Sequence, residues 1–226
     1  MTDYMMNQRL MAMMADGKDT WQFDAVVLCA GDFPTHDIPL CVLRDAPYLC
    51  CCDGAAVQAV SHGLQPDAIV GDGDSLPDDF KRQYSGIIHL VSEQEYNDMT
   101  KATRHCIRRG ARRIAYVGAT GKREDHTMGN ISLLAYYLDS LSVQPVMLTD
   151  YGFFVPASGS RTFGSFARQQ VSIFNVSSRS IVSEGLRWPS YAYSALWQGM
   201  LNEAEADTFT LRADGTYIVY RTYEPK

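Results

Sequence analysis

Acidic residues gather in two short, glycine-containing segments of the sequence. Asp72 and Asp74 stand two residues apart in Gly71-Asp72-Gly73-Asp74-Ser75, and Asp53 opens the turn Asp53-Gly54-Ala55-Ala56. Neighbouring carboxylates repel one another, so they need a reason to coexist. A hard divalent cation, Mg²⁺ above all, supplies that reason because it bridges carboxylates to substrate phosphates. The spacing therefore predicts a magnesium site, with a turn-forming aspartate pair and a helix N-cap as the structural alternatives.

Two further polar segments carry charges of both signs. Glu93-Gln94-Glu95-Tyr96-Asn97-Asp98 leads to Lys101, and Gly118-Ala119-Thr120-Gly121 leads to Arg123 and Asp125. Glycines ahead of a helix let backbone N–H groups approach a phosphate, although a simple tight turn has the same pattern. The second segment is neither a Walker A loop nor a Gly-x-Gly-x-x-Gly fingerprint. These residue types suit a phosphorylated ligand that is bound through a metal ion and a few local basic groups.

Each of these segments follows a short apolar run. Six continuous runs predict buried parallel strands over residues 25–30, 48–52, 68–70, 87–91, 114–117 and 146–148. Apolar residues at helical spacing lie between several of them, over residues 54–62, 97–109 and 125–138. This alternation predicts a doubly wound α/β domain with a mostly parallel sheet. Because parallel strands end at one edge of the sheet, four strand ends bring a carboxylate to that edge.

From about residue 152 the helical periodicity disappears. Glycine, serine and aromatic residues separate short β-type runs over residues 171–176, 181–184, 194–201, 208–211 and 217–220. Asp214-Gly215, between the last two runs, predicts a hairpin. We therefore expect an N-terminal extension over 1–24, an α/β domain over 25–151 and an all-β domain over 152–226. A β domain of about 70 residues is marginal alone, so it should pack on the first domain or on a second copy.

Composition narrows the possible functions. The 226 residues are 46% hydrophobic and 20% charged, which is typical of a globular protein with a packed core. Twenty basic residues against 26 acidic ones give a net charge of −6, which disfavours nucleic-acid and anionic-membrane binding. No apolar run reaches the roughly 18 residues of a membrane span, and the first 21 residues lack a signal-peptide layout.

The six cysteines show neither disulfide nor zinc spacing. Cys50, Cys51 and Cys52 are consecutive, and adjacent residues on a strand point to opposite faces of the sheet. We expect the cysteines to be small buried hydrophobic residues in the reducing cytosol. The sequence thus predicts a cytoplasmic protein.

The order of these segments resembles that of the thiamine pyrophosphokinases (thiamine diphosphokinases). Sequences of this family carry a DGGA-like turn, GDxDS, D-Q-D-x-T-D-x-x-K, G-G-x-x-x-R-x-D-H/Q, G-L-x-W and a final S-N pair. The corresponding segments here begin at Asp53, Gly71, Glu93, Gly121, Gly185 and Leu201. The resemblance runs from about residue 25 to the C-terminus, and six motifs in the same order are far more specific than any one of them.

The resemblance implies Mg²⁺-dependent transfer of the pyrophosphoryl group of ATP to the hydroxyl of thiamine, giving thiamine diphosphate and AMP. It implies that the α/β domain binds nucleotide and metal, and that a β-sandwich-like domain contributes thiamine binding and dimerisation. The implied partners are ATP and thiamine, with no nucleic acid and no membrane. The implied assembly is a homodimer whose active sites are shared between subunits.

The resemblance also implies roles for residues at the matching positions. The metal- and phosphate-end acidic cluster corresponds to Asp53, Asp72, Asp74 and Asp98. Positions near the nucleotide or its phosphates are Gln94, Lys101, Gly121, Arg123 and Asp125, and those at the thiamine pocket are Trp188 and Asn202. Among these, the expected catalytic residues are Asp72, Asp74, Asp98, Arg123 and Asp125. Asp98 is one candidate to accept the proton of the attacking hydroxyl.

The chain departs from the family pattern at Ala55, Asn97 and Leu201. Leu201 stands where the family has a serine that faces thiamine, which keeps another hydroxymethyl heterocycle, such as a pterin, open as the acceptor. A non-catalytic nucleotide sensor, whose β domain recruits a partner, is a third interpretation. The intact acidic residues disfavour a sensor, because a sensor need not preserve a full transfer site.

Overall fold

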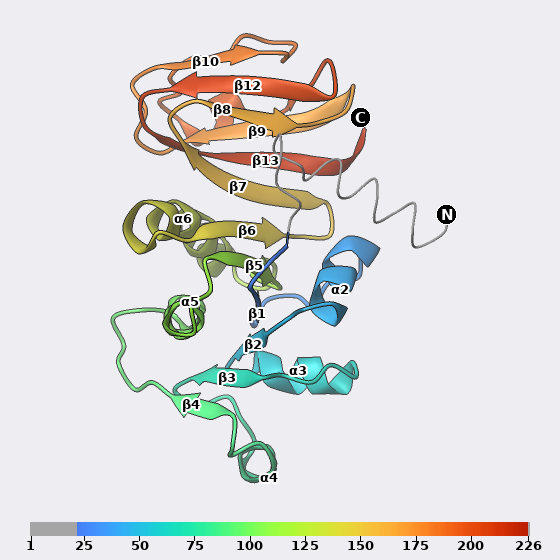
Figure 1. Ribbon diagram of the computed structural model, residues 1–226, viewed down its shortest axis with the longest axis vertical. Helices are drawn as coiled ribbons and strands as arrows, with labels where there is room; N and C mark the ends of the chain where they lie inside the picture. The colour runs from blue at the N-terminus through green and yellow to red at the C-terminus, as the bar shows by residue number, and fades with distance from the viewer. Residues whose placement is uncertain (1–21, 226) are drawn as a thin grey trace. The chain divides into compact units, whose positions relative to one another are not determined.

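We describe residues 22–225 of a computed structural model of the chain, which divides into two compact units (Figure 1). One unit spans Phe23–Asp150, and the other begins at Tyr151 and runs to the C-terminal end. Most of the expected N-terminal extension, residues 1–21, lies outside the described residues. Within the described part of the chain, no helix has the length and hydropathy to cross a membrane.

The first unit is built on six parallel strands in the order β6-β5-β1-β2-β3-β4. These strands are β1 (Ala25–Leu28), β2 (Leu49–Cys52), β3 (Ala68–Gly71), β4 (Ile88–Leu90), β5 (Arg113–Val117) and β6 (Gln144–Leu148). The chain runs outward from β1 to β4 and then returns to the other side of β1 with β5. The strand order therefore reverses between β1 and β5, and the predicted doubly wound sheet is confirmed.

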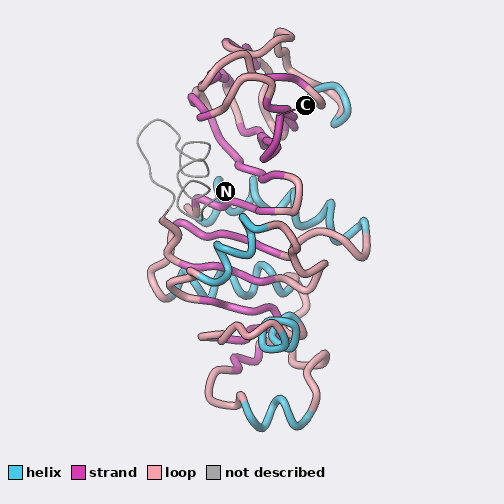
Figure 2. Tube along the Cα trace, turned by 90° about the vertical axis from the view of Figure 1, so that its right-hand side faces the viewer, coloured by secondary structure: helices cyan, strands magenta, loops and turns pink. Residues whose placement is uncertain are grey.

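Five helices accompany these strands: α2 (Asp37–Arg44), α3 (Ala55–Ser61), α4 (Asp78–Gln83), α5 (Asp98–Arg108) and α6 (Glu124–Leu141). Figure 1 shows α2 and α3 on one side of the sheet and α5 and α6 on the other, and Figure 2 shows the helices and strands after a quarter turn. Met99, Ala102, Thr103 and Cys106 of the predicted apolar face of α5 are buried, and Ile107 is half-buried. In α6 the prediction holds for Leu134 and Ala135 but is wrong for Met128, which is exposed.

Burial explains why the central strands are continuous apolar runs. Every residue of β1, β2 and β3 is buried, as expected for strands covered on both faces. The expectation of coverage on both faces is wrong for β4, where Leu90 is 69% exposed. This strand lies at the outer end of the strand order, and α4, which precedes it, buries none of its own residues.

All six cysteines are free thiols, as expected from their spacing, and five of them are buried. Cys50, Cys51 and Cys52 form most of β2. Burial raises the pKa of the Cys51 thiol well above its ordinary value, because the charged thiolate is withdrawn from water. These residues therefore serve as core side chains of the sheet.

The second unit consists of two antiparallel sheets. One contains β7 (Gly152–Ser158), β9 (Gln169–Asn175), β11 (Asn202–Glu203) and β13 (Thr216–Pro225), in the order β11-β9-β13-β7. The other contains β8 (Arg161–Gly164), β10 (Ile181–Glu184) and β12 (Thr208–Ala213), in the order β10-β12-β8. Phe163 of β8 contacts Tyr217 of β13 edge-on, which packs one sheet against the other. The all-β, sandwich-like domain is confirmed.

The expected strand over residues 194–201 is wrong. This stretch contains the 3₁₀ helix η1 (Leu196–Gly199). The side-chain oxygen of Gln198 accepts hydrogen bonds from the N–H groups of Ser194 and Ala195, at 2.8 and 2.9 Å. These bonds curl the backbone back on itself, so the segment does not extend into a ladder.

The expected hairpin at Asp214-Gly215 is also wrong, because β12 and β13 belong to different sheets. The carboxylate of Asp214 accepts hydrogen bonds from the N–H groups of Arg179 and Ser180, at 2.8 and 3.0 Å. The turn is therefore tied to the loop before β10, and it carries the chain from one sheet to the other.

Candidate active site

Asp53 directly follows β2 and adopts an unusual backbone conformation, with φ at +36°. Its Oδ2 accepts a hydrogen bond from the N–H of Ser75 at 3.0 Å, whereas its Oδ1 is buried and has no hydrogen-bond partner among residues 22–225. The residue is only 4% exposed. It does not cap α3, which begins after Gly54 without a side-chain cap. An orphaned carboxylate oxygen is costly to bury, and a bound cation would remove that cost.

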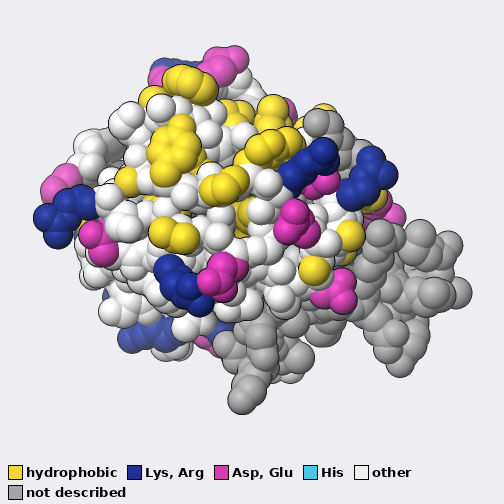
Figure 3. Space-filling view, turned by 90° about the horizontal axis from the view of Figure 1, so that it is seen from above, with side chains coloured by type: hydrophobic (Ala, Val, Ile, Leu, Met, Phe, Trp, Pro, Cys, Tyr) yellow, Lys and Arg dark blue, Asp and Glu magenta, His cyan; other side chains and the backbone are white. Residues whose placement is uncertain are grey.

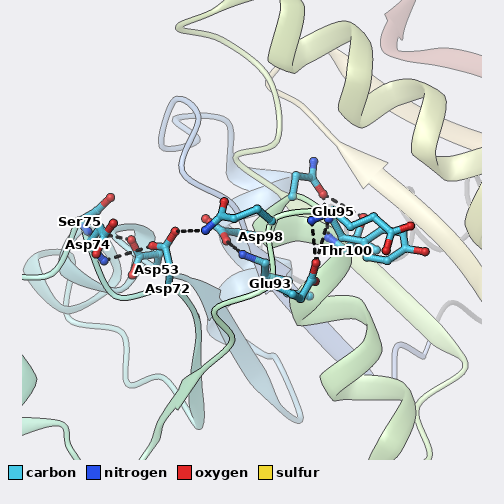
Figure 4. Close-up of polar contacts among 12 residues, drawn as sticks. Asp53, Asp72, Asp74, Ser75, Glu93, Glu95, Asp98 and Thr100 are labelled. Atoms are coloured by element: carbon cyan, nitrogen blue, oxygen red, sulfur yellow. Dashed lines mark hydrogen bonds and ion pairs between the residues drawn. The ribbon is translucent and has the colours of Figure 1, made fainter.

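The loop after β3 places two more carboxylates beside Asp53, as Figure 4 shows. Asp72 Oδ1 accepts a hydrogen bond from the N–H of Asp74 at 3.2 Å, and Asp72 Oδ2 lies 3.5 Å from Nε2 of Gln94. The N–H of Asp74 is the main cause that lowers the pKa of Asp72. The loop therefore contains the aspartate turn that the sequence allowed as an alternative to a magnesium site. That turn leaves Asp74 exposed, with its side chain available to a ligand.

Asp98, the first residue of α5, lies near the same aspartates (Figure 4). Burial raises the pKa of Asp98, and the charges of Asp53 and Asp72 raise it further, while Lys101 opposes the shift. The Lys101 ammonium lies 3.4 Å from Asp98 Oδ1, and only 3% of the lysine side chain is exposed. A buried ammonium group needs anionic partners. Lys101 therefore places a positive charge within the acidic cluster.

Two asparagines fix the start of α5 against the loop after β5. Asn97 caps α5, because its Oδ1 accepts a hydrogen bond from the N–H of Thr100 at 3.0 Å. Its Nδ2 donates to Oδ1 of Asn130 on α6, at 2.9 Å, and Asn130 in turn donates to the carbonyl of Ala119 at 2.8 Å. The departure from the family pattern at Asn97 thus supplies a helix cap that positions Asp98.

Arg123 and Asp125 form an ion pair at the start of α6. Arg123 Nε lies 3.1 Å from Asp125 Oδ1, and Nη2 lies 2.6 Å from Oδ2. Both side chains are more than half exposed. The guanidinium lowers the pKa of Asp125 below its ordinary value. A phosphate that bound Arg123 would therefore compete with a carboxylate that is already in place.

Trp188 and Asn202, the two predicted residues of the β unit, are bonded to each other. Asn202 Oδ1 accepts a hydrogen bond from the N–H of Trp188 at 3.2 Å, and Nδ2 donates to the Trp188 carbonyl at 2.8 Å. Asn202 is buried, whereas Trp188 is 48% exposed. The amide of Asn202 thus holds the backbone that presents the indole.

These two residues line a cavity of about 310 Å³, together with Pro189, Tyr191, Tyr193, Gln198, Gly199, Met200 and Leu201. Leu201, at the position where the resemblance implies a serine, has φ at +61°. Several exposed hydrophobic side chains of this unit are visible in Figure 3. The cavity has the aromatic lining that suits a flat heterocycle.

The acidic residues of the α/β unit do not form a closed metal cage. Within residues 22–225, no group of three or more His, Cys, Asp or Glu side chains has the arrangement of a metal site. Mg²⁺ does not require such a cage, because it keeps several waters and commonly binds one or two carboxylates together with substrate phosphates. The hard oxygen donors, and the orphaned Oδ1 of Asp53, fit that mode of binding.

Sequence reasoning missed two residues near this edge of the sheet, Asp32 and Asn130. Asp32 lies in the loop after β1, and the signal that identified Asp53 and Asp72, an aspartate soon after a buried strand, applies to it equally. Asn130 lies within α6 and bonds to Asn97 and Ala119, far away in the sequence. No local pattern marks it.

Two family models match the chain. The model described as thiamin pyrophosphokinase, catalytic domain, matches residues 41–144, and the one described as thiamin pyrophosphokinase, substrate-binding domain, matches residues 152–220. A curated relative, thiamin pyrophosphokinase 1 of Caenorhabditis elegans, is 29% identical over 114 residues. That match covers 46% of this chain and 46% of the relative, so it spans about half the length of each.

Solved structures share the fold. The thiamin pyrophosphokinase of Candida albicans has a TM-score of 0.74 at 19% identity, covering 89% of this chain and 90% of that one. The thiamine pyrophosphokinase of Bacillus subtilis has a TM-score of 0.71 at 17% identity, covering 88% and 99%. The yeast enzyme has a TM-score of 0.70 at 14% identity, covering 92% and 88%. At these identities the likeness establishes the fold alone.

Proposed function

Because the chain belongs to the thiamin pyrophosphokinase family, we propose that it transfers the pyrophosphoryl group of ATP to the hydroxyl of thiamine, releasing AMP and thiamine diphosphate. The α/β unit would bind the nucleotide and the metal ion, and the β unit would contribute the thiamine pocket. The observation that carries the proposal is the acidic cluster at the carboxyl edge, where Asp53 has an orphaned oxygen and Lys101 is buried among carboxylates.

Four aspartates are the proposed magnesium ligands: Asp53, Asp72, Asp74 and Asp98. When bound, Mg²⁺ would neutralise phosphate oxygens and so reduce their repulsion of the attacking hydroxyl. Asp53 supports this assignment most directly, since its Oδ1 has no hydrogen-bond partner in the part of the chain that the structure describes. Gln94 lies beside Asp72 and would orient that carboxylate.

Positive charge for the phosphates would come from Lys101 and Arg123, with N–H groups near Gly121 as further donors. Lys101 is held in place by Asp98, so its ammonium group needs little reorganisation when ATP binds. Arg123 would stabilise the charge that develops on the departing AMP, with Asp125 as its orienting partner. Asp98 is also the candidate to accept the proton of the thiamine hydroxyl, through the carboxylate oxygen that would not hold Mg²⁺.

We also propose a cytoplasmic homodimer whose active sites are shared between subunits. The family resemblance suggests this assembly, and the free thiols suit a reducing compartment. The β unit exposes large hydrophobic side chains that association would cover, among them Tyr191, Leu196 and Trp197.

The alternative acceptor, a hydroxymethylpterin, is favoured by one observation. Leu201 lines the cavity of the β unit where the family has a serine hydroxyl, so one polar contact to the acceptor is replaced by an apolar one. Such a change alters which heterocycle is bound without touching the acidic cluster.

The deciding experiment measures AMP release from ATP with thiamine, with hydroxymethylpterin and with no acceptor, each with and without Mg²⁺. We expect release that depends on thiamine and on Mg²⁺. Release that depends on the pterin would favour the alternative acceptor. ATP binding without AMP release from any acceptor would favour the sensor.

The acidic cluster is tested with Asp72→Asn and Asp74→Asn. Each variant should fold normally, while turnover falls by at least about 100-fold, because the charge is removed and the shape is kept. Asp79→Asn on α4 is a matched control, since Asp79 is exposed and the substitution removes the same charge. Near-normal rates and unaltered magnesium dependence in both cluster variants would contradict the metal site.

A further inference from the structure

The loops that follow β1 and β5 meet where the strand order reverses. The N–H of Gly31 donates to the carbonyl of Gly118 at 2.7 Å, and the N–H of Asp32 donates to the carbonyl of Thr120 at 2.9 Å. In open parallel sheets, ligands bind outside the carboxyl ends of the strands at such a reversal. The acidic cluster lies to one side of this point, after β2 and β3 and at the start of α5.

The two loops fit together without room for further side chains. A Cβ atom at residue 31 would lie 2.2 Å from the carbonyl oxygen of Thr120. A Cβ atom at residue 121 would lie 2.1 Å from Oδ2 of Asp32, and the φ of Gly121 is +83°. The carboxylate of Asp32 therefore rests on the backbone of Gly121, in the space that a side chain at residue 121 would need.

The Asp32 side chain is exposed and has no partner in the described part of the chain: between residues 22 and 225, neither a hydrogen bond nor an ion pair involves its carboxylate. The two cations of the loop after β5 are engaged elsewhere. Lys122 donates to the carbonyl of Ala30 at 2.7 Å, and Arg123 pairs with Asp125. Asp32 is thus a positioned acceptor, with its backbone fixed and its side chain available.

We propose that Asp32 binds the ribose hydroxyls of ATP, an inference that rests on the proposed function. A carboxylate repels phosphates and accepts hydrogen bonds, so its partner in a nucleotide must be a neutral donor. The ribose offers two adjacent hydroxyls, and acidic residues at the carboxyl edge of other nucleotide-binding parallel sheets bind them. The phosphates belong with the cationic Lys101 and Arg123.

Calorimetric titration with AMP, 2′-deoxy-AMP and 3′-deoxy-AMP tests this role without thiamine and without turnover. Wild-type protein should bind AMP roughly tenfold more tightly than either deoxy analogue, as expected for a hydrogen bond to a charged group. Asp32→Ala should weaken AMP binding by at least that factor, because it removes the acceptor of both hydroxyls, and it should remove the preference for AMP. Asp37→Ala, which removes an exposed carboxylate five residues away, is the matched control and should keep the preference.

Equal weakening of all three nucleotides by Asp32→Ala would overturn the inference, as would a wild-type protein that does not prefer AMP over its deoxy analogues. Asp32→Leu, which removes both acceptor oxygens and keeps a similar volume, replaces the alanine variant if that variant does not fold. Failure of the proposed function gives a different result. Suppose that wild-type protein prefers AMP, that Asp32→Ala removes this preference, and that no AMP is released from ATP with thiamine. This result would support the ribose site and contradict the proposed activity.

Discussion

Asp53 and Gly71 approach each other so closely that a Cβ atom at residue 71 would lie 2.7 Å from the Cβ of Asp53. Only glycine allows the end of β3 to pass the aspartate at this distance. The approach buries the Asp53 carboxylate. One oxygen accepts a hydrogen bond from Ser75, and the other has no hydrogen-bond partner among the described residues. Burial of this incompletely bonded carboxylate lowers the stability of the fold and holds a negative charge at the sheet edge.

Asp53→Asn should therefore cost activity without costing stability. The neutral amide keeps an acceptor for the N–H of Ser75 and removes a buried charge that faces Asp72 and Asp98. We expect the melting temperature of the metal-free protein to stay constant or rise by up to about 3 °C, which corresponds to roughly 1 kcal/mol for a chain of this size. Turnover should fall at least about 100-fold. Thermal unfolding in EDTA and AMP release measure the two effects, and a large drop in melting temperature would show that Asp53 is a structural residue.

Arg123→Ala should affect turnover more than stability. The Arg123–Asp125 pair is exposed, and exposed ion pairs contribute at most about 1 kcal/mol. We expect a change in melting temperature below about 3 °C and a fall in turnover of at least about tenfold. Arg179→Ala, which removes another exposed arginine paired with an aspartate, is the control and should keep full turnover. Intact activity with a lowered melting temperature would assign Arg123 a structural role.

His105 should make the protein less stable in mild acid. Burial lowers its pKa from 6.5 to about 4, with His89, Arg108 and Arg109 adding to the shift. Between these two pH values the unfolded chain binds more protons than the folded one, so the free energy of unfolding should fall as the pH drops from 6.5 toward 4. The buried ring bonds to the hydroxyl of Tyr48 at 2.9 Å.

The test compares urea unfolding of wild type and His105→Gln across this pH range. The variant should lose stability less steeply, because glutamine does not titrate. His62→Gln is the control, since His62 is exposed and should leave the slope unchanged. Parallel curves for wild type and His105→Gln would contradict the prediction.

Asn202→Ala should disorder the backbone that presents Trp188. The change removes the two hydrogen bonds to the Trp188 backbone and a third from the N–H of Glu203. Their loss costs roughly 3 kcal/mol and lowers the melting temperature by about 6–12 °C. The KM for thiamine should rise, while AMP binding, which belongs to the α/β unit, should stay unchanged. Trp188→Phe should raise the KM for thiamine with little change in melting temperature. A rise in KM for ATP instead would place Asn202 outside the acceptor pocket.

Mixed dimers test whether sites are shared between subunits. Asp74→Ala and Trp188→Ala chains should each be nearly inactive as homodimers. In a mixed dimer one site carries both lesions and the other carries neither, so random exchange should restore roughly a quarter of wild-type activity. No recovery, with subunit exchange verified by mass spectrometry, would show that each site lies within one subunit.

The sequence by itself determined the elements whose signal is local. Buried parallel strands must be apolar on both faces, so β1, β2 and β3 appear as continuous apolar runs, and the amphipathic face of α5 repeats at helical spacing. The order of those elements was enough to predict that acidic residues collect at one edge of the sheet. The motif order was enough to indicate the family.

Only the tertiary structure determined which residues form hydrogen bonds with one another at the acidic edge of the sheet. Asp53 bonds to Ser75, 22 residues away, and Asn97 bonds to Asn130, 33 residues away. The same holds for the turn at Asp214, whose carboxylate binds N–H groups 34 and 35 residues earlier and sends the chain to a second sheet. Periodicity and turn propensity report on neighbours along the chain. Contacts between distant residues depend on which backbones the packed core brings together, so no local pattern contains them.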